Sequence, residues 1–157
     1  MKKDKNLINS HTKVFIAGHE GLVGSAIHKT LLSRFNCQIV VASKSELDLR
    51  NQNKVNNFLK ESDINYIVIA AAKVGGIHAN SSYPADFIYD NLMIQSNLIQ
   101  SAYSNDIKRI LFLGSSCIYP KDINDPIKEE DLLSSKLEKT NEPYAVAKIA
   151  GLKMCES

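Results

Sequence analysis

The sequence is poor in the features that mark disulfide-rich, metal-binding and membrane proteins. It has no tryptophan, three cysteines among 157 residues and no apolar run of membrane-spanning length. Cys37, Cys117 and Cys155 are odd in number and far apart, with no C-x-x-C pair or histidine cluster. This argues against a disulfide framework and against a structural zinc site, so no metal site is expected.

An excess of charge of one sign is lacking as well. The formal net charge is +2 and the two signs are intermixed, so neither nucleic acid nor an anionic membrane is expected as a partner. The lysine-rich residues 1–5 lead into no signal-peptide core. We therefore expect a cytoplasmic protein, and its 157 residues are enough for one domain with a core.

What is present is an alternation of short apolar strands with helical patterns. Strands are expected at 14–17, 39–42, 66–70 and 109–113, the last two buried, and helices at 22–35, 51–61, 86–104 and from Pro143 onwards. This order predicts an α/β fold with a doubly wound parallel sheet. Residues 1–12 are predicted to be a flexible leader, 13–157 the domain, and 121–142 a charged surface excursion.

A glycine-rich turn joins the first strand to the first helix. Gly18, Gly21 and Gly24 allow a sharp bend and a close approach of a phosphate, and the start of a helix attracts an anion. This pattern is typical of the opening of a dinucleotide-binding Rossmann unit. The spacing is G-x-x-G-x-x-G and not the commoner G-x-G-x-x-G, so an ordinary strand–helix turn remains the alternative.

The end of the second strand bears on the choice of dinucleotide. A carboxylate at this place binds the ribose of NAD, whereas here the strand ends in Ser43 and Lys44. A hydroxyl and a cation suit the 2′-phosphate of NADP. A solvated loop lysine is the alternative for Lys44, and the nearby Glu46 keeps NAD possible.

A candidate catalytic group follows the fourth strand and begins the last helix. Tyr144 and Lys148 stand four residues apart on one helix face, where a cation would lower the phenol pKa from about 10 toward a usable general acid. Ser115 could bind a substrate carbonyl, and Cys117 could exchange a proton. The alternatives are a surface Tyr/Lys pair and a buried structural cysteine.

These residues together resemble a known family. Gly18-x-x-Gly21-x-x-Gly24, Ser115 and Tyr144-x-x-x-Lys148 resemble the extended short-chain dehydrogenase/reductases. More narrowly, the GDP-L-fucose synthases are similar from about residue 13 to the end, in the strings VFIAGHEGLVGSAI, AAAKVGGIHAN, YPADFIYDN, LGSSCIYPK and NEPYAVAKIAG. The resemblance implies NADPH-dependent 3,5-epimerisation and 4-reduction of GDP-4-keto-6-deoxy-D-mannose to GDP-L-fucose.

The resemblance also implies roles for the catalytic group. Tyr144 would donate a proton to the C4 ketone, and Ser115 would orient the carbonyl. Lys148 would be the pKa partner of the tyrosine and would anchor the cofactor ribose. Cys117 would be one of two acid/base groups for epimerisation.

Three stretches would border NADP(H). They are the glycine turn (Gly18, His19, Glu20, Gly21, Leu22, Val23, Gly24), the adenosine side (Lys44, Ser45, Glu46, Leu47, Asp48, Leu49) and the nicotinamide side (Leu113, Gly114, Ser115, Ser116). Helices 86–104 and 143–157 would pair in a homodimer, or their apolar faces would serve the core alone. Asn91 is expected to be a surface amide, with a polar contact behind the catalytic residues as the alternative.

Two departures from the family pattern limit these expectations. Glu20 stands where the family often has an arginine, which weakens the NADP assignment. Family members are about twice as long, so we expect a C-terminally truncated N-terminal half whose GDP-sugar lobe and second acid/base histidine lie outside it. The alternatives are another NAD(P)-dependent nucleotide-sugar epimerase or dehydratase, and a non-catalytic dinucleotide-binding remnant.

Overall fold

Four parallel strands form the central sheet of the computed structural model, which describes residues 8–107, 109–123 and 125–157. The strands are β1 (Lys13–Ala17), β2 (Gln38–Val40), β3 (Tyr66–Ile69) and β4 (Arg109–Phe112), in the order β2-β1-β3-β4. All three pairings are parallel, and Phe15 pairs with Val40 on one side and with Ile67 on the other. The predicted doubly wound α/β fold is confirmed.

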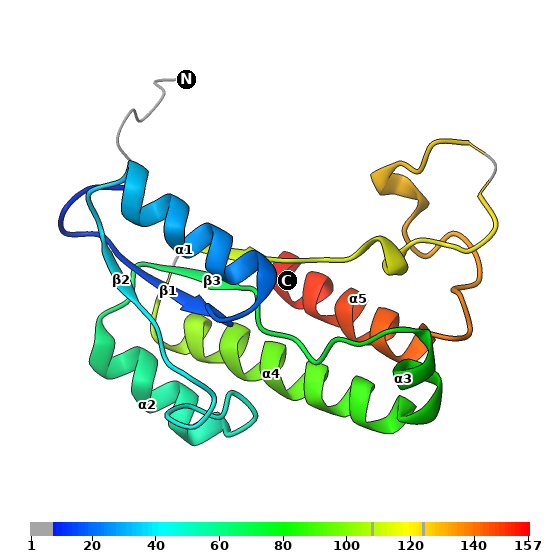
Figure 1. Cartoon of the computed structure of the whole chain (residues 1–157), viewed down its shortest axis with the longest axis horizontal. Coiled ribbons are helices and arrows are strands. Elements are labelled where there is room, and N and C mark those ends of the chain that lie inside the picture. Colours follow the sequence, from blue (N-terminus) through cyan, green and yellow to red (C-terminus); the bar gives the residue numbers. More distant parts are fainter. Residues whose placement is uncertain (1–7, 108, 124) are drawn as a thin grey trace.

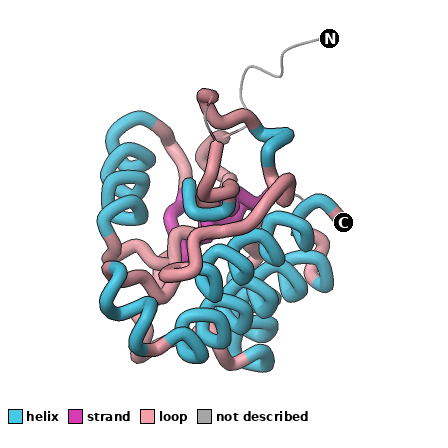
Figure 2. Tube along the Cα trace, turned by 90° about the vertical axis from the view of Figure 1, so that its right-hand side faces the viewer, coloured by secondary structure: helices cyan, strands magenta, loops and turns pink. Residues whose placement is uncertain are grey.

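Helices cover both faces of the sheet (Figures 1 and 2). On one face lies α1 (Leu22–Arg34), whose Ile27 and Leu31 pack against Ile16. The other face carries α2 (Gln52–Ser62), α4 (Pro84–Ser104) and α5 (Glu142–Glu156). Alternate residues of a strand point to opposite faces, so β1 serves both layers.

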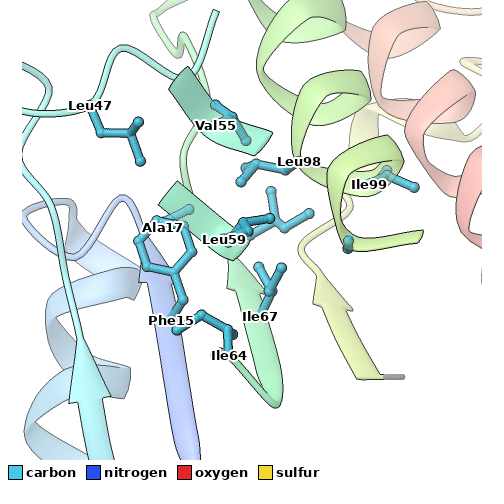
Figure 3. Close-up of a cluster of buried hydrophobic side chains, with 11 residues drawn as sticks. Phe15, Ala17, Leu47, Val55, Leu59, Ile64, Ile67, Leu98 and Ile99 are labelled. Carbon is cyan, nitrogen blue, oxygen red and sulfur yellow. The ribbon is translucent and has the colours of Figure 1, made fainter. Parts of the chain in front are cut away.

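The main core lies on the side of α2 and α4 (Figure 3). Phe15 of β1, Leu59 of α2 and Leu98 of α4 are each at most 1% exposed. Transfer of such side chains out of water contributes on the order of 2 kcal/mol each. This core fixes α4 against the sheet, and α4 in turn carries α5, which lies beside it (Figure 1).

The expected helices are present, and their ends follow ordinary capping chemistry. Asn51 caps α2 by accepting a hydrogen bond at Oδ1 from the backbone nitrogen of Lys54, at 3.0 Å. Proline stands in the first turn of α4 and of α5, where a missing N–H costs nothing. The sequence reading missed α3 (Ile77–Ser82), a helix of six residues with too few turns to show an apolar period.

The fourth strand differs from its prediction. It is an edge strand, and Leu111 is 53% exposed instead of buried. Ile110 and Phe112 point to the core beneath α4 and α5, whereas Leu111 points to the face covered by α1. In the described part of the chain no element lies beyond β4 to cover that side.

Asn91 is a second correction, because it is 2% exposed and not a surface amide. Its Oδ1 accepts from the backbone nitrogen of Lys73 at 2.9 Å, and its Nδ2 donates to the Lys73 carbonyl at 3.0 Å. An amide side chain has both a donor and an acceptor. It can therefore pair with both the N–H and the C=O of a residue whose backbone has no neighbouring strand. Asn91 thereby ties the loop after β3 to α4.

The described N-terminal residues lead into the domain, and the charged segment lies on its surface. Of the predicted leader, residues 1–7 lie outside the described residues, and Asn9 and Thr12 form a hydrogen-bonded turn that enters β1. In the excursion at 121–142, which contains the short 3-10 helix η2 (Glu129–Asp131), no described residue is buried. No helix in the described ranges has the length and apolar character needed to cross a membrane.

Candidate active site

The glycine turn lies at the carboxyl end of β1, between the two central strands. Gly18 has φ +88°, and a Cβ there would come within 2.6 Å of the Ala71 nitrogen. A Cβ on Gly24 would lie 2.1 Å from the Gly18 carbonyl oxygen. These two glycines therefore serve the turn and the close packing of α1 on the strand.

Gly21 has a different role, because a Cβ there would contact only the Gly18 carbonyl, at 3.4 Å. It is the N-cap of α1 and provides no side-chain cap, and the first turn of the helix has no acidic residue. The first N–H groups of α1 are thus open to an anion. Leu22 is 90% exposed beside them, and the Nδ1 of His19 is buried with no hydrogen-bond partner among the described residues. The turn fits a pyrophosphate.

The strand order places this turn where ligands bind in open α/β sheets. The chain runs from β1 outward to β2, and then crosses to β3 on the other side of β1. The carboxyl ends of β1 and β3 flank the reversal of strand order, and such crevices receive dinucleotides. The loop after β4 lies at the same edge of the sheet because all strands are parallel.

Hydrogen bonds to Glu46 close the turn after β2. The Glu46 carboxylate accepts from the backbone nitrogen and the hydroxyl of Ser43, each at 2.7 Å, and these bonds lower the Glu46 pKa. Lys44 and Ser45 are exposed at the tip of this turn. The side chain of Leu47 is buried in the main core, against which Leu49 also packs, so neither side chain is free to contact a cofactor.

Asp48 belongs to an ion-pair network that the sequence reading missed. Arg50 binds Asp48 at 2.8 Å and Asp90 of α4 at 3.1 Å, and Lys73 binds Asp90 at 3.3 Å. The hydrogen bonds from Arg50 lower the Asp48 pKa to about 2. The network connects the loops after β2 and β3 through α4. The D-x-R spacing was visible in the sequence, whereas Asp90 is 40 residues away from Arg50.

The four candidate catalytic residues come together beside the end of β4. Ser115 precedes the 3-10 helix η1 (Ser116–Ile118), and its Oγ accepts from the Cys117 backbone nitrogen at 3.3 Å. Tyr144 lies in the first turn of α5 and hydrogen-bonds to Ser115. Lys148 follows one turn later and donates from Nζ to the Leu113 carbonyl at 2.9 Å.

The Tyr144 pKa is shifted in the direction opposite to the sequence prediction. Burial raises it, the hydrogen bond with Ser115 works against that rise, and the Cys117 charge adds to it. Lys148 is 4% exposed, and burial lowers its own pKa to about 8. Its Nζ lies 4.7 Å from the centre of the Phe112 ring and 6.0 Å from that of Tyr144. The cation is therefore held by the Leu113 carbonyl just after β4 and by the Phe112 ring, not by a hydrogen bond to the phenol oxygen.

Two further polar residues of the site were missed. Gln95 of α4 is buried and donates from Nε2 to the Ala147 carbonyl, next to Lys148. Asn141, the N-cap of α5, donates from Nδ2 to the Cys117 Sγ at 3.1 Å. Asn141 could have been found, because an asparagine followed by Glu-Pro marks a helix start three residues before Tyr144.

Other site classes find no support in this geometry. Within the described residues, no group of three or more His, Cys, Asp and Glu side chains could hold a metal ion. All three cysteines are free. The described contacts do not join Lys44 to the catalytic residues, which lie on the other side of the glycine turn in the strand order.

Comparisons with known proteins agree with this arrangement. The chain is 54% identical over 148 residues to the GDP-L-fucose synthase of Escherichia coli (strain K12), covering 94% of this chain and 46% of that protein. It is 53% identical over 157 residues to putative GDP-L-fucose synthase 2 of Arabidopsis thaliana, covering 100% and 48%. The chain thus spans about half the length of the curated relatives it matches.

A solved structure is similar to this chain both in sequence and in fold. MlghC, a GDP-mannoheptose C4 reductase from Campylobacter jejuni with NADP bound, matches with a TM-score of 0.90 and 40% identity, covering 95% of this chain and 47% of that chain. The model of the NAD dependent epimerase/dehydratase family matches residues 14–157. Since this match takes in the whole sheet, the glycine turn and α5, the chain belongs to the NAD-dependent epimerase/dehydratase family.

Proposed function

We propose that this chain is the cofactor-binding portion of an NADPH-dependent enzyme that converts GDP-4-keto-6-deoxy-D-mannose to GDP-L-fucose. The observation that carries the proposal is the grouping of Ser115, Cys117 and Tyr144 at the carboxyl edge of the sheet: Ser115 hydrogen-bonds to Tyr144 and to the Cys117 backbone nitrogen, and the Cys117 charge acts on the phenol. A thiol beside a tyrosine and a serine suits a reaction that both moves protons next to a ketone and reduces it. The identity with GDP-L-fucose synthases supports the choice of substrate.

Residues 13–157 form the NAD(P)-binding domain in this proposal. The open helix start at Gly21 and the unpartnered His19 Nδ1 fit a bound dinucleotide. NADPH would supply hydride. The adenosine end would lie along Lys44–Leu49, with Lys44 next to the 2′-phosphate, and the nicotinamide end along Leu113–Ser116. Glu20 is exposed and offers no positive charge, so selection of NADPH rests on Lys44.

The chain's own residues would then divide the proton chemistry. Ser115 binds the ketone oxygen, and Tyr144 gives that oxygen a proton as the carbonyl is reduced. Lys148, whose pKa is already lowered to about 8, holds the loop after β4 and contacts the cofactor ribose. The Cys117 thiolate takes a proton from a carbon next to the ketone, and the electron pair left behind is delocalised onto the carbonyl oxygen.

Replacement of Tyr144 by phenylalanine tests the assignment. In an assay with the keto sugar and NADPH, this chain combined with any polypeptide encoded directly downstream should lose at least a thousandfold in reduction rate. The NADPH affinity, measured by fluorescence titration, should change less than threefold, because the phenol oxygen serves the proton transfer. Tyr119→Phe, which keeps Tyr144, is the matched control. Unchanged reduction by Tyr144→Phe would overturn the assignment.

We propose also a cytoplasmic homodimer. The outer faces of α4 and α5 carry exposed apolar side chains, with Tyr89 59% exposed and Val146 41% exposed. Helices α4 and α5 lie side by side, so a second copy could cover both. A reducing compartment would preserve the three free thiols. Sedimentation velocity should find a dimer that Val146→Glu dissociates, and a monomeric parent chain would refute this part.

A further inference from the structure

Asn141 begins α5, but its side chain does not cap the helix. Asparagine is among the best N-cap residues because its Oδ1 accepts from the backbone nitrogen two or three residues later. Here the Asn141 side chain makes no capping hydrogen bond, although its backbone carbonyl accepts from the Ala145 nitrogen at 3.0 Å. Asn51 at the start of α2 does make the side-chain cap. The Asn141 side chain is therefore held by another interaction.

That interaction is the contact with the Cys117 sulfur. Asn141 Nδ2 donates to Sγ at 3.1 Å, a short distance for a donor to sulfur. The Oδ1 of the same amide is buried and has no partner in the described residues. A buried acceptor without a partner opposes folding, so an orientation that leaves it unpaired needs a compensating contact. The N–H to sulfur bond is the only one that the described side chain makes.

We propose that Asn141 is the positioning residue of Cys117, and that it stabilises the sulfur in the thiolate form. The inference deepens the proposed function, on which its catalytic meaning rests. An amide N–H stabilises a negative sulfur more than a neutral thiol. The start of α5 adds the positive end of the helix dipole.

Asn141 also couples the two proton-transfer groups. It is three residues before Tyr144, and Tyr144 hydrogen-bonds to Ser115, whose Oγ accepts from the Cys117 nitrogen. The start of α5 thereby holds both groups: Asn141 binds the Cys117 sulfur, and Tyr144 in the first turn carries the phenol. The titratable groups in the first turn of α5 are Tyr144, on which the Cys117 charge acts, and the exposed carboxylate Glu142, whose charge opposes a thiolate. An enzyme that moves a proton at carbon and another at oxygen needs both groups fixed relative to one substrate.

Thiol alkylation tests the inference without turnover. In the 157-residue chain with Cys37→Ser and Cys155→Ser, the rate of iodoacetamide addition to Cys117 is measured by mass spectrometry at pH 7 and pH 10. Asn141→Ala should slow the reaction at pH 7 roughly three- to tenfold. The rate at pH 10, where most thiols are ionised, should change less than twofold, because it reports access to the sulfur. Asn141→Asp should be slowed at least as much at pH 7, since a carboxylate opposes a thiolate.

Asn51→Ala is the matched control, because it removes a true N-cap far from Cys117. It should lower the thermal midpoint and leave the alkylation rate unchanged. Equal rates at pH 7 for the parent and both Asn141 variants, with native circular dichroism, would overturn the inference. If Asn141→Ala fails to fold, Asn141→Asp decides alone, since aspartate keeps the N-cap preference. Failure of NADPH binding in the parent would count against the proposed function and leave the role of Asn141 toward the sulfur intact.

Discussion

At the scale of single residues, the site depends on charged and polar groups that burial has changed. Lys148 is almost fully buried, with one hydrogen bond to a carbonyl and ring contacts with Phe112 and Tyr144. Burial without a carboxylate partner disfavours the ammonium, which is why its pKa falls while that of Tyr144 rises. Both shifts favour the neutral forms. A bound substrate or cofactor that brings negative charge would move the lysine back toward the cation.

The lowered Lys148 pKa predicts a rise in stability with pH. The folded pKa of about 8 lies below the ordinary 10.5, so between these values the unfolded chain binds more protons. The Lys148 contribution to the free energy of unfolding should therefore increase from pH 8 to pH 10, by on the order of 2 kcal/mol, while the raised pKa values of Tyr144, Cys37 and Cys155 act in the opposite direction in the parent and in the variants alike. Urea denaturation checks this through the difference between the parent and Lys148→Met, which should grow by that amount from pH 8 to pH 10. Lys153→Met, on the exposed side of α5, should follow the pH dependence of the parent, and parallel curves for the parent and Lys148→Met would contradict the prediction.

Lys44 is predicted to select NADPH over NADH. Its side chain is exposed at the tip of the turn after β2 and forms no ion pair among the described residues. Lys44→Ala should weaken NADPH binding about tenfold and NADH binding less than twofold, because only NADPH has the 2′-phosphate. Fluorescence titration of both dinucleotides gives the ratio. Lys60→Ala on α2 is the control, and an equal loss for both cofactors would remove the assigned role.

At the scale of elements, the first helix is placed by one close backbone contact. The position of Gly24 in the first turn of α1 leaves no space for a Cβ over the Gly18 carbonyl. Helix α1 has few other anchors, since Leu22, Val23 and Leu32 are exposed and only its inner side packs on Ile16. The approach of α1 to the end of β1 therefore depends on this glycine, and so does the direction in which its open N–H groups point.

Gly24→Ala should displace α1 and lower the free energy of unfolding by about 3 kcal/mol, since the backbone must move to admit the methyl group. The same variant should lose NADPH affinity at least tenfold. Gly76→Ala is the matched control, because a Cβ there meets nothing within 4 Å. It should change stability by no more than about 1 kcal/mol. Urea denaturation and dinucleotide titration test both, and an unaffected Gly24→Ala would show that α1 adjusts freely.

At the scale of the whole molecule, the sheet has an open edge at β4, and the face of β4 on the side of α1 is uncovered in the described residues. Strand β4 is an edge, and its Leu111 is exposed on the side of α1, so this face is open in the described structure. The chain spans about half the length of its curated relatives, 46% and 48% of the two compared above. The proposed dinucleotide site, at the glycine turn and Leu113–Ser116, lies within this chain.

We expect the 157-residue chain to bind NADPH weakly and not to turn over the keto sugar. In the proposed function the glycine turn and Leu113–Ser116 would supply the cofactor contacts, but the sugar would have contacts on one side only. Fluorescence titration should detect binding, and NADPH absorbance at 340 nm should stay constant with the keto sugar present. Addition of a polypeptide encoded directly downstream of this chain should restore the oxidation of NADPH. Steady oxidation by the chain alone would contradict this expectation.

The sequence by itself determined the alternation of strands and helices, the parallel sheet and the family. Apolar strands, a glycine turn and a long helical period are local patterns, and a Rossmann unit is assembled from such patterns in chain order. The four candidate catalytic residues were likewise visible as short strings. Only the tertiary structure decided which groups are buried: Asn91 inside, Leu111 outside, Lys148 with a lowered pKa. Burial and pairing depend on residues far away in the chain, as with Asn141 and Cys117, 24 positions apart, and no local pattern records such a distance.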